Sequence, residues 1–143
     1  MVNPEYFGKL VLYKHPAGAV LKSVKNDSLK EDYLSVSVSG DSMGYFRATL
    51  KYEMSGKSYK GWIKKENYLG TYSRNYNPKA KLPLFTDADK KSKVTYVKSE
   101  VTFCPVTRCN NKWVYTTLRV NGKEISGWLA PDMQCANAYT TCN

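Results

Sequence analysis

The chain has few of the residues from which common active sites are built. Its 143 residues include one histidine, His15, which precedes Pro16 in a turn-like segment, so neither a cysteine nor a serine nucleophile has an obvious base. The closest acidic pair, Asp87 and Asp89, lies in a lysine-rich turn typical of a solvated loop. No glycine-rich phosphate-binding loop occurs. We therefore predict a protein that is not an enzyme and that needs no metal or cofactor.

Long apolar runs are absent as well. No segment approaches the roughly 20 apolar residues of a membrane-spanning helix. Residues 1–8 form a short polar lead-in without the basic and apolar blocks of a secretory signal. We expect the given chain to be soluble, with or without the removal of a leader.

The positive charge is not concentrated anywhere. The net charge is +10, and the two halves of the chain share it about equally. A uniformly basic surface attracts polyanions but does not define a partner. Binding of nucleic acid remains a hypothesis, marked by steep salt dependence, which the sequence does not favour.

What the chain does contain is an internal repeat. Residues 56–63 (GKSYKGWI) recur as residues 122–129 (GKEISGWL), and residues 9–13 (KLVLY) recur as residues 81–85 (KLPLF). The spacing of about 66 to 72 residues is that of a small domain and exceeds that of short solenoid repeats. The sequence therefore predicts two copies of one domain.

The predicted copies span residues 1–74 and residues 75–143. Residues 67–78 (NYLGTYSRNYNP) are polar, rich in tyrosine and end in a turn dipeptide, as expected between two modules. We predict a linker there.

Short strands dominate the pattern within each copy. Residues 33–38 (YLSVSV) alternate apolar and serine residues, as a half-buried strand does. Asn121-Gly122 is the strongest signal of a tight hairpin. Strands separated by Gly, Asn, Asp and Ser, with no helical period, predict an all-β protein with five strands in each copy.

The long strands of the two copies, residues 45–52 and 113–120, align directly. Counting from Val36 to Leu50 and from Val101 to Leu118 gives the second copy three more residues. This comparison predicts an enlarged loop over residues 104–111.

All four cysteines lie in the second copy. Their spacing favours the disulfides Cys104–Cys109 and Cys135–Cys142, although four cysteines allow three pairings. Such bonds would place the protein outside the reducing cytosol. Free buried thiols and a four-cysteine zinc site are the alternatives.

Each copy ends on a Gly-Trp-apolar strand followed by a polar single turn, in residues 61–69 (GWIKKENYL) and 127–135 (GWLAPDMQC). In this the chain resembles bacterial SH3-like domains. Its cysteine-bearing tail is similar to tandem SH3-like proteins of secreted or envelope type in Bacteroidetes-like bacteria. The resemblance implies two small five-stranded SH3-like barrels in tandem, in a protein that is periplasmic, secreted or at the cell surface.

The resemblance further implies recognition without catalysis. Our main hypothesis is a module that binds peptidoglycan peptides or an envelope protein, although the hydrolase domain that often accompanies such modules is missing. The alternative is an inhibitor or immunity-type protein that blocks a wall-degrading enzyme. The oligomeric state is left open.

In SH3-like barrels the ligand groove usually lies between the first long loop and the loop before the central strand. Packing in the core or rim is the alternative role for every residue that this geometry selects. Trp62 and Trp128 are instead expected to be structural, because each follows a glycine that permits close approach of a strand. The ligand-binding candidates selected in this way are Tyr13, Tyr33, Tyr45 and Tyr68 in the first copy, and Phe85, Lys112, Trp113 and Tyr115 in the second. Arg108 is a further candidate, because the enlarged loop, stiffened by a disulfide, would present it, and rigid loops tend to carry specificity.

Overall fold

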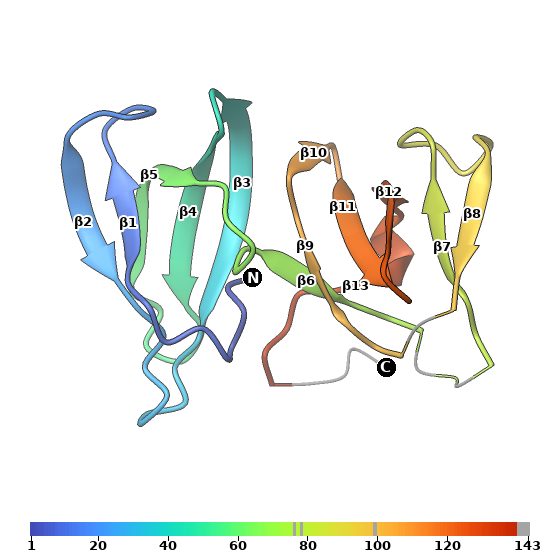
Figure 1. Ribbon diagram of the computed structural model, residues 1–143. Coiled ribbons are helices and arrows are strands. Elements are labelled where there is room, and N and C mark those ends of the chain that lie inside the picture. The colour runs from blue at the N-terminus through green and yellow to red at the C-terminus, as the bar shows by residue number, and fades with distance from the viewer. Residues whose placement is uncertain (76, 78, 99, 140–143) are drawn as a thin grey trace. The chain divides into compact units, whose positions relative to one another are not determined.

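The computed structural model describes residues 1–75, 77, 79–98 and 100–139. Strands and bridges account for 53 % of the described residues, which contain no α-helix, so the predicted all-β class is confirmed. The chain divides into two compact units, Met1–Leu69 and Gly70–Asn143 (Figure 1). No helix in the described part has the length and apolar character needed to cross a membrane.

The first unit contains one antiparallel sheet of five strands in the order β2-β1-β5-β4-β3 (Figure 1). Strands β1 and β2 form a hairpin, and β3, β4 and β5 follow one another as a meander. The strand β5 joins the two groups by pairing with β1. The bounds are β1 Leu10–Tyr13, β2 Val20–Val24, β3 Leu34–Ser42, β4 Tyr45–Tyr52 and β5 Ser58–Lys64.

Alternation along the strands separates a buried face from an outward one. In β4, Phe46, Ala48 and Leu50 are buried, whereas Arg47 between them is exposed. This is the period of two that a half-buried strand requires. Each fully buried leucine or phenylalanine contributes about 1.5 to 3 kcal/mol relative to an exposed one.

The N-terminal residues belong to the core of the first unit. Val2 is fully buried, bridges to Leu69 and donates its backbone N–H to the carbonyl oxygen of Leu34 at 3.0 Å. The prediction of a polar lead-in over residues 1–8 is therefore wrong at this point. An isolated valine has no periodicity by which a sequence could identify it as a strand residue.

The second unit contains a five-stranded sheet in the order β10-β11-β12-β7-β8 and a three-stranded sheet in the order β13-β6-β9. A 3₁₀ turn, Pro131–Met133, connects β12 to β13. The core is formed by Leu82, Leu84, Val97, Cys104, Leu118 and Leu129. The bounds are β6 Gly70–Ser73, β7 Leu82–Phe85, β8 Val94–Val97, β9 Phe103–Pro105, β10 Arg108–Asn110, β11 Trp113–Val120, β12 Lys123–Leu129 and β13 Gln134–Cys135.

The repeated sequence motifs pair with one another inside each unit. Trp62 lies opposite Tyr13 in the ladder of β1 and β5, and Trp128 lies opposite Phe85 in the ladder of β7 and β12. A Cβ atom added to Gly127 would lie 2.9 Å from the Cβ of Leu84. The expected close approach of a strand to the glycine is thus observed.

The predicted enlarged loop over residues 104–111 is wrong. Most of these residues lie in β9 and β10, and Arg108 and Asn110 pair with β11 as Gly40 and Ser42 pair with β4. The turn that follows has a residue with positive φ in both units, 50° at Met43 and 53° at Asn111.

The strand register shows that the segment leading into β4 and the segment leading into β11 have the same length. Val36 is nine residues before Tyr45, and Cys104 is nine residues before Trp113, so Cys104 and not Val101 matches Val36. A buried cysteine behaves as a small apolar residue and takes the inward position that the sequence comparison gave to a valine.

The predicted linker contains a strand. Gly70–Ser73 forms β6, which pairs with β9 and β13 inside the second unit. The two units therefore meet between Leu69 and Gly70, five residues before the predicted boundary at 74/75. Tyr76 and Pro78 of that segment lie outside the described residues.

The predicted Cys104–Cys109 disulfide is not formed. Cys104 is a free thiol that is fully buried in the core of the second unit and donates to the carbonyl oxygen of Thr102 at 3.6 Å. Burial raises the pKa of this thiol to about 12. Cys135 is also buried; Cys142 lies outside the described residues, so the Cys135–Cys142 pairing stays a prediction.

Candidate functional site

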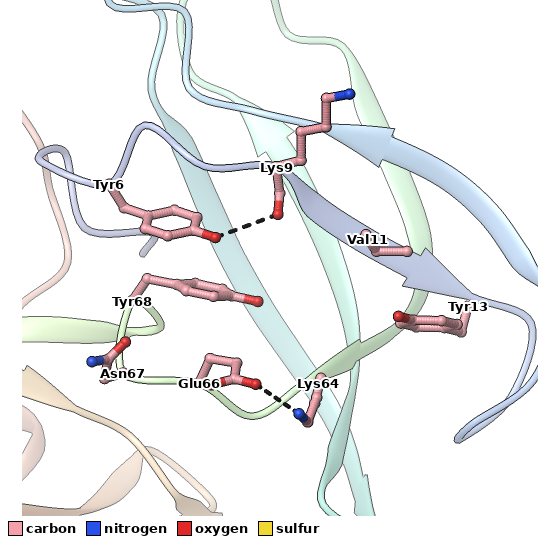
Figure 2. A pocket seen from close by; sticks show the side chains of 8 residues that line it. All are labelled: Tyr6, Lys9, Val11, Tyr13, Lys64, Glu66, Asn67 and Tyr68. Carbon is pink, nitrogen blue, oxygen red and sulfur yellow. Dashed lines mark hydrogen bonds and ion pairs between the residues drawn. The ribbon is translucent and has the colours of Figure 1, made fainter.

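A groove of about 350 Å³ opens on the first unit (Figure 2). Its walls come from three segments: the lead-in to β1, the outward face of β1, and the end of β5 with the turn that follows it. The residues that line it are Tyr6, Lys9, Val11, Tyr13, Lys64, Glu66, Asn67 and Tyr68.

The local fold explains why these side chains face outward. Leu10 and Leu12 are fully buried, so strand alternation turns Val11 and Tyr13 to the opposite face. After β5, the backbone N–H of Leu69 donates to the carbonyl oxygen of Glu66 at 3.0 Å. Leu69 is buried by its bridge to Val2, and Tyr68 beside it lines the groove.

One wall of the groove is a stacked pair of tyrosines. The rings of Tyr6 and Tyr68 have centroids 4.2 Å apart and planes 20° apart, as Figure 2 shows. The Tyr6 hydroxyl donates to the carbonyl oxygen of Lys9 at 3.5 Å. Burial raises the pKa of Tyr68 to about 12, so its hydroxyl is protonated and available as a hydrogen-bond donor at neutral pH.

A buried asparagine holds the segment that carries Tyr6. The side-chain amide of Asn26 donates to the carbonyl oxygens of Asn3 at 3.1 Å and Tyr6 at 3.5 Å. Its side-chain oxygen accepts the backbone N–H of Leu34 at 3.0 Å. Asn26 is 4 % exposed, so it positions the groove wall without reaching a ligand.

The groove carries charges of both signs. The Lys64 ammonium pairs with the Glu66 carboxylate at 3.0 Å, and the hydrogen bond that Lys64 donates to Glu66 raises the pKa of Lys64. Lys9 has no ion-pair partner within the described part of the chain. The groove is therefore net positive, which favours a ligand with a carboxylate.

The groove of the first unit adjoins an aromatic pair that recurs in the second. Tyr13 meets Tyr45 edge to face, with centroids 5.6 Å apart and planes 86° apart. Phe85 meets Trp113 in the same way, at 5.4 Å and 89°. Tyr45 and Trp113 are the first residues of β4 and β11, so the two pairs occupy equivalent positions in the repeat.

A second hollow, of about 450 Å³, borders Trp113. Lys90 and Asp132 form an ion pair across its rim at 2.8 Å, and the hydrogen bond from Lys90 lowers the pKa of Asp132. Asp132 follows β12 as Glu66 follows β5 in the first unit. The lining residues are Ala88, Asp89, Lys90, Trp113, Pro131 and Asp132.

Arg108 and Tyr115 lie together on the outward face of the second unit. The Arg108 guanidinium carbon is 3.8 Å from the centre of the Tyr115 ring and 5.5 Å from that of Trp128. The two rings meet edge to face at 5.3 Å. Trp128 therefore lies in a cationic and aromatic cluster in which Arg108 is exposed and both rings are half-buried, next to two of the predicted ligand-binding residues.

Two predicted residues lie apart from these features. Tyr33 precedes β3, and its carbonyl oxygen accepts the backbone N–H of Glu53; it lines neither hollow. Lys112 lies in the turn before β11, where its carbonyl oxygen accepts the side-chain amide of Gln134 at 2.9 Å.

Sequence reasoning missed Tyr6, Lys9, Lys64 and Glu66. Lys64 and Glu66 were recognised only as part of a polar turn, and the equivalent acid Asp132 is the signal that would have selected Glu66. Tyr6 has no counterpart in the repeat, so only the folded chain shows its contact with Tyr68.

Metal ligands do not gather in the described part of the structure, where no group of three His, Cys, Asp or Glu side chains is placed to hold an ion.

Comparison with known proteins found no matching family model, no matching curated protein and no matching solved structure.

Proposed function

We propose that the chain is a non-catalytic binding protein of the cell envelope, made of two SH3-like barrels that each take a ligand at an aromatic groove. The carrying observation is the edge-to-face pair repeated at Tyr13–Tyr45 and Phe85–Trp113. In both units a member of the pair, Tyr13 or Trp113, lines a solvent-open hollow. A core role alone would not require an open hollow at both positions.

The strand connections support the proposed barrels. In the first unit, Val2 is linked to both Leu69 and Leu34. In the second unit, β6 is paired with both β13 and β9. The same three segments of each repeat are thus joined outside the five-stranded sheet, as expected where a sheet curls onto itself.

The groove chemistry favours a short peptide with carboxylates and an amine. Lys9 and Lys64 suit carboxylates, Glu66 suits an ammonium group, and the rings of Tyr13 and Tyr68 offer flat apolar surface with hydroxyl groups. Peptidoglycan stem peptides have these groups, which agrees with the ligand that the resemblance to bacterial SH3-like domains implies. The same resemblance supports a periplasmic or secreted location.

Retention on purified peptidoglycan tests this proposal. We expect the chain to cosediment with peptidoglycan at low and moderate salt and to be released by soluble muropeptides. Tyr68→Ala should weaken binding about tenfold, because it removes one wall of the groove. Tyr96→Ala is the matched control, since Tyr96 is 62 % exposed and lines neither hollow.

Two results would contradict the proposal. One is the absence of retention under both salt conditions. The other is binding by Tyr68→Ala that is as strong as that of Tyr96→Ala and the wild type, which would indicate charge-driven adsorption of a basic protein. If the chain instead forms a stable complex with an envelope protein, that protein is the ligand, and the proposed role of the groove as the binding site is unchanged.

A further inference from the structure

The second unit has an open strand edge where the first unit has a paired one. In the first unit, β3 pairs with β4 along its length, as far as Leu34 opposite Tyr52. In the second unit, the pairing of β10 with β11 ends at Tyr115, and β9 pairs with β6. Within the described residues, the edge of β11 over residues 117–120 has no ladder partner.

A proline explains where the pairing stops. Pro105 occupies the position of Ser37, which lies opposite Thr49 in the first unit. Proline has no backbone N–H, so it supplies no donor to β11 at this point. Proline in a strand is accordingly confined to edges and irregular positions.

The open edge presents regular hydrogen-bonding groups. A two-residue turn joins β11 to β12, so Val120 and Lys123 form a hydrogen-bonded pair. Alternation then directs the backbone N–H and C=O groups of Thr117 and Arg119 away from β12. Tyr115 has the same orientation, and its carbonyl oxygen accepts the Thr107 N–H at 3.0 Å.

A groove of about 500 Å³ lies along this edge, a size typical of ligand sites. Its lining is mixed, with polar and apolar surface in similar amounts, and Val101 on its rim is 39 % exposed. Charged groups are contributed by Glu100 and Arg119. Arg119 lies opposite Glu124 in the ladder of β11 and β12 but forms no ion pair within the described residues. The lining residues are Glu100, Val101, Thr102, Phe103, Pro105, Thr117, Leu118, Arg119 and Val120.

We propose that this groove binds an extended peptide segment of a partner protein, which adds a strand to β11 at Thr117 and Arg119. The first unit shows the chemistry that such an edge accepts, because Leu34–Ser37 (LSVS) alternates apolar and small hydroxyl residues against β4. The unpaired guanidinium of Arg119 on a chain of net charge +10 selects a segment with an acidic residue opposite it. Addition of a strand to a sheet edge is a recurrent mode of peptide recognition. The site shares no residue with either aromatic hollow and goes beyond the function proposed for them.

Amide hydrogen exchange on the whole chain tests the open edge directly. The Thr117 and Arg119 amides should exchange at least tenfold faster than those of Thr49 and Lys51, which hold the equivalent positions in β4. Equal protection of the two sets would overturn the proposal.

A capped pentapeptide of alternating valine and serine, with one serine replaced by aspartate, tests the occupant. We expect it to slow exchange at Thr117 and Arg119 only, and we expect the lysine counterpart to bind at least tenfold more weakly. Arg119→Gln should abolish this preference. Equal binding of both peptides, or protection that rises with protein concentration and not with peptide, would overturn the proposed partner.

Pro105→Ser restores the residue found at the equivalent position in the first unit. It should let β9 pair with β11, protect the Thr117 amide and weaken peptide binding at least tenfold. Unchanged peptide binding in a variant whose Thr117 amide has become protected would overturn the proposal. The wild-type exchange comparison decides the matter if Pro105→Ser does not fold.

Discussion

The ring of Tyr6 stacks on the ring of Tyr68, with centroids 4.2 Å apart. The contact joins the first residues of the chain to the turn that ends the first unit, and Asn26 holds it from the buried side through the carbonyl oxygen of Tyr6. Burial of the Tyr68 hydroxyl raises its pKa to about 12. The groove wall is therefore coupled to the stability of the unit at alkaline pH.

Tyr68 should contribute stability that is lost at high pH. Because its pKa is higher in the folded protein than the ordinary value of 10.0, its contribution is complete below pH 10 and declines as the pH rises towards about 12. Tyr68→Phe should flatten this part of the curve of unfolding free energy against pH, as measured by urea denaturation. A curve as steep as that of the wild type would show that Tyr68 titrates normally.

Asp32 should stabilise the turn between β4 and β5. Its carboxylate accepts the backbone N–H groups of Met54 at 2.8 Å and Ser55 at 3.1 Å. Burial opposes its ionisation, but hydrogen bonds from Ser55 and Met54 outweigh burial and lower its pKa below 3.8. Its contribution is therefore present above the ordinary pKa and lost as the pH falls through the lowered value.

Thermal denaturation of Asp32→Asn measures this contribution. The variant should melt at a lower temperature than the wild type at neutral pH, and the difference should shrink in acid. A constant difference across this range would contradict the role of the charge. Asp87→Asn, in an exposed turn of the other unit, is the control.

Thr116→Val should stabilise the second unit by about 1 kcal/mol, because it removes a buried hydroxyl whose desolvation is not compensated. Thr116 is fully buried, and its Oγ1 has no hydrogen-bond partner in the described structure. The first unit has Ala48 at this position. Thr117→Val is the matched control, since that hydroxyl is exposed and bonded to Ser126 at 2.8 Å. Chemical denaturation that ranks the two variants in the opposite order would exclude this explanation.

Gly127→Ala should destabilise the second unit by about 1 to 3 kcal/mol through overpacking. The added Cβ atom would lie 2.9 Å from Leu84 Cβ and 3.0 Å from the carbonyl oxygen of Phe85. Gly40→Ala is the control, because its Cβ atom would approach only the Arg47 side chain, at 3.3 Å. If denaturation shows similar stabilities for the two variants, the glycine before Trp128 is not required for strand approach.

Alternation and the internal repeat carried most of the fold prediction. The serine-spaced run before Val38 was predicted as a strand because apolar residues recur at every second position, and a period of two is visible in one sequence. Leu34 of this run is buried in the core, and Val36 is half-buried. The pairing of Tyr13 with Trp62 was not visible, since register between distant strands depends on packing. Equivalent motifs nevertheless identified both members of the pair.

The false loop and the false disulfide have the same origin, because two neighbouring segments of the second copy both show the alternation of a strand. Val101 and Phe103 alternate with Thr102 as convincingly as the residues around Val36 alternate, so the alignment slipped by three residues and produced a false loop. The disulfide at Cys104 failed for the same reason. A cysteine that occupies an inward strand position packs in the core and does not reach a neighbour in the next strand.

The candidate site was predicted in part because its aromatic residues belong to the repeat. Tyr13, Tyr45, Phe85 and Trp113 are at equivalent positions, whereas the Tyr6 wall depends on one buried asparagine, Asn26. Contacts made by a single copy leave no trace in a comparison of the two copies.

The number of stem-peptide sites per chain tests the central claim most directly. Isothermal titration with a soluble stem peptide should give two sites for the wild type, one site for Tyr13→Ala, one site for Trp113→Ala, and no binding for the double variant. This result would show that the repeated aromatic pairs form equivalent ligand sites. Unchanged stoichiometry and affinity in the double variant, with the fold intact by circular dichroism, would contradict the account.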